Sequence, residues 1–265
     1  MLKDITVGRY VDTGSFLHKL DARTKIICTL LFSITALSCS GIISLAVLAA
    51  AALFAVFASR LPLRYIIKGL KPLRWLIIFT IIFNILTVDG NIIWQWRSLH
   101  ITSEGVKFAL IIASRFILFM TGASLLTLTT SPISLTDGLA LLMRPLKRIK
   151  VPVDDIAMII SVTLRFIPLF ADEAERIMKA QRARGADFNS GRLMSRLRSV
   201  IPITIPLFLS VFRKADELSL AMDSRCYGRG TRSSRKKSHI SVNDLIFAGV
   251  LIIICGFLLI FEFYH

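Results

Sequence analysis

The sequence lacks the signatures of several protein classes. Its 265 residues include four cysteines, at positions 28, 39, 226 and 255, whose spacing fits neither a zinc site nor a thiol-redox pair. No glycine-rich phosphate loop is present, so we expect any ATP hydrolysis to belong to a partner chain. The four histidines are too dispersed for a metal site. The sequence therefore predicts no catalytic residue, no metal ion and no cofactor.

Acidic residues are also scarce, with 17 Asp and Glu against 33 Lys and Arg, a net charge of +16. Hydrophobic residues make up 54% of the chain, more than the roughly 45–50% of soluble domains. This combination indicates a membrane protein with a basic cytoplasmic side, and the positive charge needs no nucleic acid to explain it. Charges recur through the first 25 positions, so we expect no cleaved signal peptide.

Long runs without charge predict about five transmembrane helices. The 34 uncharged residues from Ile26 to Ser59 exceed the about 20 that cross a bilayer core, so we expect the chain to fold back at residues 38–41. The predicted spans are Ile26–Cys39, Ile42–Ser59, Trp75–Val88, Phe108–Thr130 and Leu245–Phe261. Arg115 could face a partner. Because Phe116–Thr136 contains no charge, we expect instead that the membrane helix begins after it.

The interval Ser131–Asn243 holds 20 basic and 10 acidic residues and is expected to stay inside. Its apolar stretches, Ile156–Phe170 and Val200–Phe212, are only about 13–15 residues long and contain prolines, so we predict half-buried helices rather than crossings. The predicted fold is an all-α, multi-pass membrane protein. It has an N-terminal membrane domain (1–130), a cytoplasmic domain of long amphipathic helices (131–243) and a final transmembrane helix (244–265).

The cytoplasmic interval repeats a pattern. The letters IPLF occur at 167–170 and again at 205–208, and each is followed by an ADE sequence and then by an arginine between small residues. Near a helix C-terminus, such an arginine can present its planar fork to a carboxylate in a groove. We predict two docking contacts, with Gly185 and Gly228 as helix stops. The candidate contact residues are Ala183, Arg184, Gly185, Ser224, Arg225 and Cys226.

A plainer alternative is that these arginines are solvated or face lipid headgroups. We expect that role for the remaining basic residues near them. These are Arg182, Arg192, Arg196, Arg198, Arg229, Arg232, Arg235, Lys236 and Lys237.

Three separated motifs carry a family resemblance. Residues 15–25 (SFLHKLDARTK) resemble the amino-terminal signature of the transmembrane component of energy-coupling factor transporters, the EcfT/CbiQ family. Residues 165–187 are similar to its first coupling-helix motif, and residues 212–228 to its second. In the second motif, Ser224 and Cys226 stand where the family commonly has alanine and glycine.

The resemblance implies a scaffold subunit in the cell membrane of a bacterium or archaeon. Such subunits link two ABC-type ATPase subunits to a separate substrate-binding membrane subunit for a vitamin or a transition-metal ion. Their long coupling helices cross in an X, and the arginine tips, here Arg184 and Arg225, dock into the ATPases. This sequence does not indicate the substrate, because the resemblance assigns substrate recognition to another subunit.

Two other classes stay open at this point. One is a membrane-embedded, lipid-modifying enzyme that holds a metal through clustered carboxylates, for which Asp154-Asp155 is the only adjacent aspartate pair. This pair also suits the start of a helix, where acids complement the dipole. The other is a self-contained carrier, which would need polar residues along a path inside the membrane.

Overall fold

The computed structural model describes residues 10–11, 13–96, 99–186, 193–228 and 241–264. The chain divides into two compact units. One contains Gly8–Pro145 together with Ser238–His265, and the other contains Leu146–Lys237. We refer to them as the membrane unit and the coupling unit.

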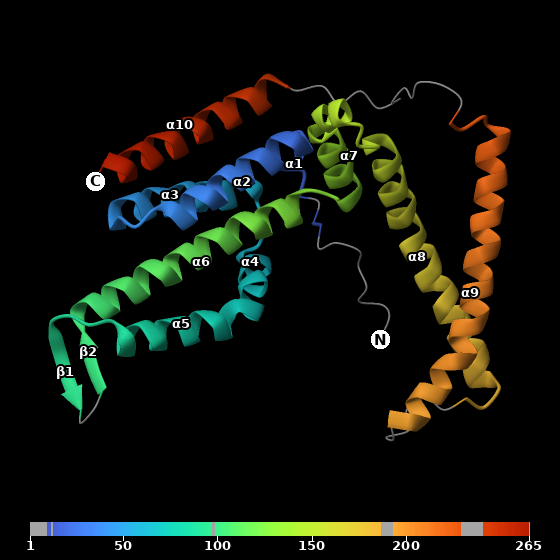
Figure 1. The fold of residues 1–265 in the computed structure, drawn as a ribbon, viewed down its shortest axis with the longest axis horizontal. Coiled ribbons are helices and arrows are strands. Elements are labelled where there is room, and N and C mark those ends of the chain that lie inside the picture. The colour runs from blue at the N-terminus through green and yellow to red at the C-terminus, as the bar shows by residue number, and fades with distance from the viewer. Residues whose placement is uncertain (1–9, 12, 97–98, 187–192, 229–240, 265) are drawn as a thin grey trace. The chain divides into compact units, whose positions relative to one another are not determined.

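Helices dominate the membrane unit (Figure 1), and each of the five predicted spans coincides with one of them. The helices are α1 (Phe16–Lys19), α2 (Ala22–Ser38), α3 (Ile42–Ser59), α4 (Leu63–Leu70), α5 (Arg74–Thr87), α6 (Ser103–Thr129), α7 (Pro132–Leu142) and α10 (Val242–Tyr264), with a short 3-10 turn at Lys71–Leu73. An antiparallel hairpin of β1 (Ile92–Trp96) and β2 (Leu99–Thr102) joins α5 to α6, which the sequence analysis did not predict.

Three helices in the described part of the chain are long and apolar enough to cross a membrane: Ile42–Ser59, Ser103–Thr129 and Val242–Glu262. The helix α2 has 17 residues and α5 has 14, which correspond to lengths of about 26 and 21 Å. Both are shorter than the roughly 30 Å of a hydrocarbon core. The protein is thus a helical membrane protein, and crossing by α2 and α5 stays a prediction.

The core of the membrane unit forms where α2, α3, α6 and α10 meet. Its buried side chains include Phe32, Leu48, Ile111 and Leu258. Gly122 on α6 allows close packing, because a Cβ at that position would lie 2.9 Å from the ring of Phe32. The outward faces of the same helices carry many exposed large apolar side chains, as expected where lipid rather than water surrounds the helices.

Contacts near the helix ends give the relative directions of the helices. Lys25 at the start of α2 bonds to the carbonyl of Thr129 at the end of α6, so α2 and α6 are antiparallel. Asp244 and Glu262 of α10 bond to residues before and after α2, so α10 is parallel to α2. Gly105 of α6 lies against the carbonyls at the end of α5, so these two helices are antiparallel.

The prediction that the helix begins after Arg115 was wrong. Thr102 caps α6 by accepting a hydrogen bond from the amide of Gly105, so the helix starts at Ser103 and Arg115 lies well inside it. The guanidinium is satisfied by the turn between α2 and α3: Nε donates to the Cys39 carbonyl at 2.8 Å and Nη2 to Ser40 Oγ at 3.0 Å. The uncharged run is also divided, because Pro132 begins α7.

The coupling unit consists chiefly of two long helices, α8 (Val153–Ala183) and α9 (Leu193–Ser224), preceded by a 3-10 turn at Arg144–Ile149. Asp154 and Asp155 lie in the first turn of α8, where the sequence analysis expected them, and Asp154 pairs with Lys147. Both helices continue through their prolines, Pro168 in α8 and Pro202 and Pro206 in α9. The two helices pack together and cross in Figure 1.

Candidate functional site

The C-terminal end of α8 presents Arg184. The helix ends at Ala183, and Gly185 follows with a positive φ of 89°. The amide of Gly185 donates to the Arg182 carbonyl at 3.0 Å, and the amide of Ala186 donates to the Gln181 carbonyl at 3.0 Å. This pair of bonds is the Schellman motif, in which a left-handed residue ends the helix and satisfies its last carbonyls. The predicted stop at Gly185 is confirmed.

The end of α9 repeats this arrangement with different residues. The amide of Cys226 donates to the Asp223 carbonyl at 2.9 Å, and the amide of Tyr227 donates to the Met222 carbonyl at 3.0 Å. Cys226 has a φ of 53° and so occupies the left-handed position that Gly185 holds in α8. Gly228 also has positive φ, at 86°, but it lies two residues further on. Arg225 therefore sits one residue before the left-handed position, as Arg184 does.

Both arginine ends are open to solvent. All six residues that the sequence analysis proposed as contacts are exposed. Among the described residues, the side chains of Arg184 and Arg225 make no hydrogen bond or ion pair, whereas the nearby Arg182 contacts Met178 Sδ at 3.6 Å. The hydroxyl of Ser224, the small neutral residue before Arg225, donates to the Ala221 carbonyl of its own helix at 3.0 Å. The structure thus leaves each guanidinium available to an external carboxylate.

The two arginines are far apart within the coupling unit. Figure 1 shows the C-terminal ends of α8 and α9 at opposite ends of the crossed pair. A helix of 32 residues such as α9 extends about 48 Å. Arg184 and Arg225 therefore cannot enter one groove together, and they suit two separate but similar contact points.

Other basic residues of the sequence analysis are placed only in part. Arg192, Arg229, Arg232, Arg235, Lys236 and Lys237 lie outside the described residues. Arg196 and Arg198 lie within α9, and their side chains are not described. Headgroup contact by these residues stays a prediction.

The amino-terminal signature at residues 15–25 folds into a polar network at the start of α2. The ring of His18 lies 2.8 Å from the Val11 carbonyl through Nε2 and 2.7 Å from Ser15 Oγ through Nδ1, and because a carbonyl can only accept, Nε2 donates to it. Lys25, only 7% exposed, donates to the carbonyls of His18 at 3.2 Å and Thr129 at 3.0 Å. The signature thus ties α1, α2 and α6 together.

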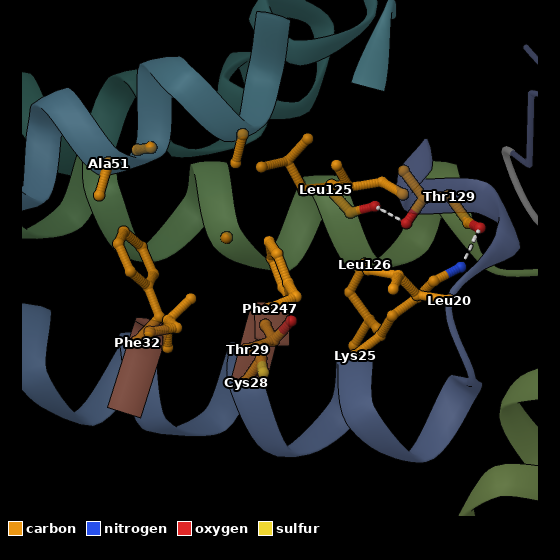
Figure 2. Close-up of a pocket in the computed structure, with 15 residues that line it drawn as sticks. Leu20, Lys25, Cys28, Thr29, Phe32, Ala51, Leu125, Leu126, Thr129 and Phe247 are labelled. Atoms are coloured by element: carbon orange, nitrogen blue, oxygen red, sulfur yellow. Dashed lines mark hydrogen bonds between the residues drawn. The ribbon is translucent and has the colours of Figure 1, made fainter. Parts of the chain in front are cut away.

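An apolar pocket adjoins this network in the membrane unit. Figure 2 shows Lys25 at one end of it, pointing to Thr129, and Phe32 toward the other end. Among the described residues, side chains from α1, α2, α3, α6 and α10 line the pocket, and Lys25 is the only charged one of these. Its ammonium already has two carbonyl partners, so we assign the pocket no ligand.

Sequence reasoning missed the two carboxylates that anchor α10. Asp244, 2% exposed, accepts hydrogen bonds from the amide of Asp21 at 2.8 Å and from the amide of Ser241 at 2.7 Å. Glu262 accepts from the amides of Ser40 at 2.6 Å and Gly41 at 3.0 Å. Sequence offered one local signal, the Ser241-x-x-Asp244 spacing of a capping box. It offered none for contacts more than 200 positions apart.

Comparison with known proteins now decides the family. The family described as cobalt transport protein, CbiQ, matches residues 13–237. The chain is 43% identical over 264 residues to the energy-coupling factor transporter transmembrane protein EcfT of Ruminiclostridium cellulolyticum, covering 99% of each chain. It is 46% identical over 260 residues to EcfT of Heliobacterium modesticaldum (96% and 98% covered) and 39% identical over 239 residues to EcfT of Bacillus subtilis (89% and 90%).

The chain belongs to this family. The resemblance carried by three motifs is therefore confirmed over nearly the whole length, and the chain is a transmembrane component of the energy-coupling factor type. The CbiQ match includes both arginine ends and ends before α10. The two carboxylate anchors of α10 thus lie beyond the matched region.

Gly185 and Cys226 hold equivalent left-handed positions at the ends of α8 and α9 of this EcfT/CbiQ chain. Substitutions at the two positions should therefore change the stability of the helix ends in opposite directions. A non-glycine residue in the left-handed region costs about 1–2 kcal/mol. Cys226→Gly should therefore stabilise the end of α9 by about 1 kcal/mol, and Gly185→Ala should weaken the end of α8 by a similar amount. Hydrogen exchange at the amides of Tyr227 and Ala186 measures both effects. Cys226→Ala is the control and should leave exchange unchanged, because it removes the thiol but keeps the strained conformation.

Proposed function

We propose that this chain is the scaffold subunit of an ATP-driven uptake transporter in the cell membrane. It would couple two ABC-type ATPase subunits to a separate membrane subunit that binds a vitamin or a transition-metal ion. The names of the relatives support the transporter class. The observation that carries the coupling role is the pair of exposed arginine ends, Arg184 and Arg225, which share one hydrogen-bond pattern and lie apart.

The proposed mechanism relies on the packing of α8 against α9. Each guanidinium would form a bidentate contact with a carboxylate in a groove of one ATPase, a geometry that a planar fork favours. When nucleotide draws the ATPases together, the ends of α8 and α9 would be displaced with them. Because the two helices pack against each other, a displacement of their ends would move the pair rather than bend single turns. That movement would be passed to the substrate-binding subunit.

We propose a topology of five crossings with the N-terminus inside and residue 265 outside. The alternating directions of α2, α6 and α5, and the parallel direction of α10 and α2, support it. Residues 131–243 would then lie in the cytoplasm. A reporter that is active only outside the cell should be silent after Asn189 or Lys237, two positions outside the described residues. Reporter activity at either position would contradict the topology.

The purified chain alone should neither bind nor hydrolyse ATP, because ATP binding is assigned to the partner subunits. Hydrolysis should appear when the ATPase subunits copurify. A nucleotide-binding titration and a phosphate-release assay on the chain before and after removal of the ATPases measure this. Hydrolysis that persists at full rate in the single chain would refute the scaffold role.

The enzyme alternative receives no support from the aspartate pair. Asp154 is paired with Lys147, and both aspartates lie in the first turn of α8, where they serve the helix start.

A further inference from the structure

A basic surface on the membrane unit is left unused by the proposed coupling role. Between the end of α3 and the start of α5, the chain carries five basic residues and no acidic one. We give the name α4 surface to the exposed basic, aromatic and large apolar side chains from the start of α4 to the start of α5. It comprises Arg64, Tyr65, Ile67, Lys68, Lys71, Arg74 and Trp75.

One side of α4 is fixed to the protein and the other is free. Ile66 is 6% exposed and packs with Leu125 and Leu128 of α6. Gly69 lies so close to α6 that a Cβ there would be 2.6 Å from Ser124 Oγ. The basic residues at positions 64, 68 and 71 follow the four-and-three spacing of one helical side, away from Ile66. The helix therefore presents its charges outward from an anchored base.

The free side combines charge with exposed apolar and aromatic groups. Ile67 is 64% exposed and Trp75 is 72% exposed. Lys68 lies over the ring of Tyr65, 5.9 Å from its centre, and Arg74 lies over the ring of Trp75 at 5.5 Å. Such side chains, with an apolar body and a polar or charged tip, are typical of the bilayer interface. Among the described residues, none of the five bases forms an ion pair with an acid.

The position of the α4 surface indicates what covers it. It joins the end of α3, a helix long enough to cross the membrane, to the start of α5. Figure 1 shows α4 running across α5 and α6 rather than along them. A short amphipathic helix in that position lies in the plane of the headgroups. A protein partner would have to displace lipid from both its apolar and its basic groups.

We propose that the α4 surface binds the anionic headgroups of bilayer phospholipids. Each base near an anionic bilayer is worth about a fivefold gain in affinity. Arg64, Lys68 and Lys71 together would give a clear preference for anionic over zwitterionic lipid, while Ile67 and Trp75 insert beside the glycerol region. This binding would hold the α3–α5 connection at one depth in the membrane. The proposed lipid contact involves neither Arg184 nor Arg225, so it is independent of the proposed docking of the ATPase subunits.

Trp75 supplies the probe. Trp94→Phe and Trp96→Phe leave it as the only tryptophan of the three in the chain. The full chain is placed in phosphatidylcholine vesicles, and quenching of Trp75 by brominated phosphatidylglycerol is compared with quenching by brominated phosphatidylcholine at equal mole fraction. We expect the anionic lipid to quench at a mole fraction more than tenfold lower, and this preference to weaken as salt is raised.

The test variant is Arg64→Gln/Lys68→Gln/Lys71→Gln, for which the preference should fall to no more than the about fivefold that the remaining Arg74 can supply, while quenching by phosphatidylcholine persists. That persistence shows that the variant is folded with Trp75 still in the interface. The charge-matched control is Arg144→Gln/Arg148→Gln/Lys150→Gln, three exposed bases that should leave the preference intact. Equal quenching by both lipids in the parent chain, or an equal loss in the control, would overturn the proposal.

Two further measurements distinguish bilayer lipid from other ligands of the α4 surface. Inorganic phosphate at millimolar concentration should not relieve the quenching, and relief would indicate a free-anion site instead of a bilayer contact. The measurement is repeated on the complex that copurifies with this chain. If no brominated lipid then reaches Trp75, a partner subunit covers the surface and the lipid assignment is wrong.

Discussion

Replacing Arg184 and Arg225 together by alanine should abolish copurification of the ATPase subunits and reduce substrate uptake to background. If each guanidinium meets a carboxylate in a partner groove, truncation leaves that carboxylate buried and unpaired, at a cost of about 2–5 kcal/mol per site. A loss of about 3 kcal/mol is roughly a 150-fold weaker Kd. Each single variant should therefore weaken assembly and uptake, and the double variant should lose both. Substrate binding by the separate subunit should survive.

Lysine should rescue poorly at either position, because it keeps the charge and loses the planar fork. Arg176→Ala is the matched control, since Arg176 is an exposed arginine on α8 two turns before its end. It should leave copurified ATPase and uptake within error of the wild type. If the double variant assembles and transports normally, or if lysine substitutes fully, the arginines are ordinary surface charges and the coupling proposal fails.

Replacing Asp244 by alanine should give the second large effect, a loss of about 2–4 kcal/mol in the free energy of unfolding. The side chain is 2% exposed and accepts from two backbone amides, those of Asp21 and Ser241. A buried amide without a partner costs about 1–3 kcal/mol. Thermal unfolding in detergent measures the change. The stability of Asp244→Asn should lie between that of the wild type and that of Asp244→Ala. The carbonyl oxygen of asparagine can replace one acceptor, and its amino group cannot replace the other.

Asp89 provides the control for this prediction. It is an exposed aspartate of the same unit, and Asp89→Ala should change stability by no more than about 0.5 kcal/mol. If Asp244→Ala and Asp89→Ala unfold at the same temperature, then the hydrogen bonds that join α10 to the start of α2 contribute nothing measurable to stability.

Most of the helical layout could be predicted from the sequence because its signals are local. The length of the uncharged run from Ile26 to Ser59 exceeds one crossing, and small residues at 38–41 mark the fold-back that the structure shows between α2 and α3. Gly185 predicted the end of α8 because only glycine enters the left-handed region at little cost. The repeated pattern of an apolar stretch followed by charges likewise located α8 and α9, and three motifs located the family.

The structure decided which residue plays the part of Gly185 in α9. Sequence reasoning chose Gly228 as the stop, and the Schellman bonds centre on Cys226 instead. Residue type favours a helix end, because glycine takes the left-handed position at the lowest cost, but it does not fix the end alone. In α9 the flanking backbone hydrogen bonds hold a cysteine in that position.

By itself the sequence determined the membrane class, the positions of the five apolar helices, the two arginine-tipped helices and the family. Only the tertiary structure decided the partners of the isolated charges: Arg115 with the turn at Cys39, Asp244 with Asp21, and Glu262 with Gly41. A charge in an apolar run shows that some polar partner must exist, since burial without one is costly. The partners here are backbone groups, and every residue carries the same backbone donors and acceptors, so no side-chain pattern could reveal which of them lies near.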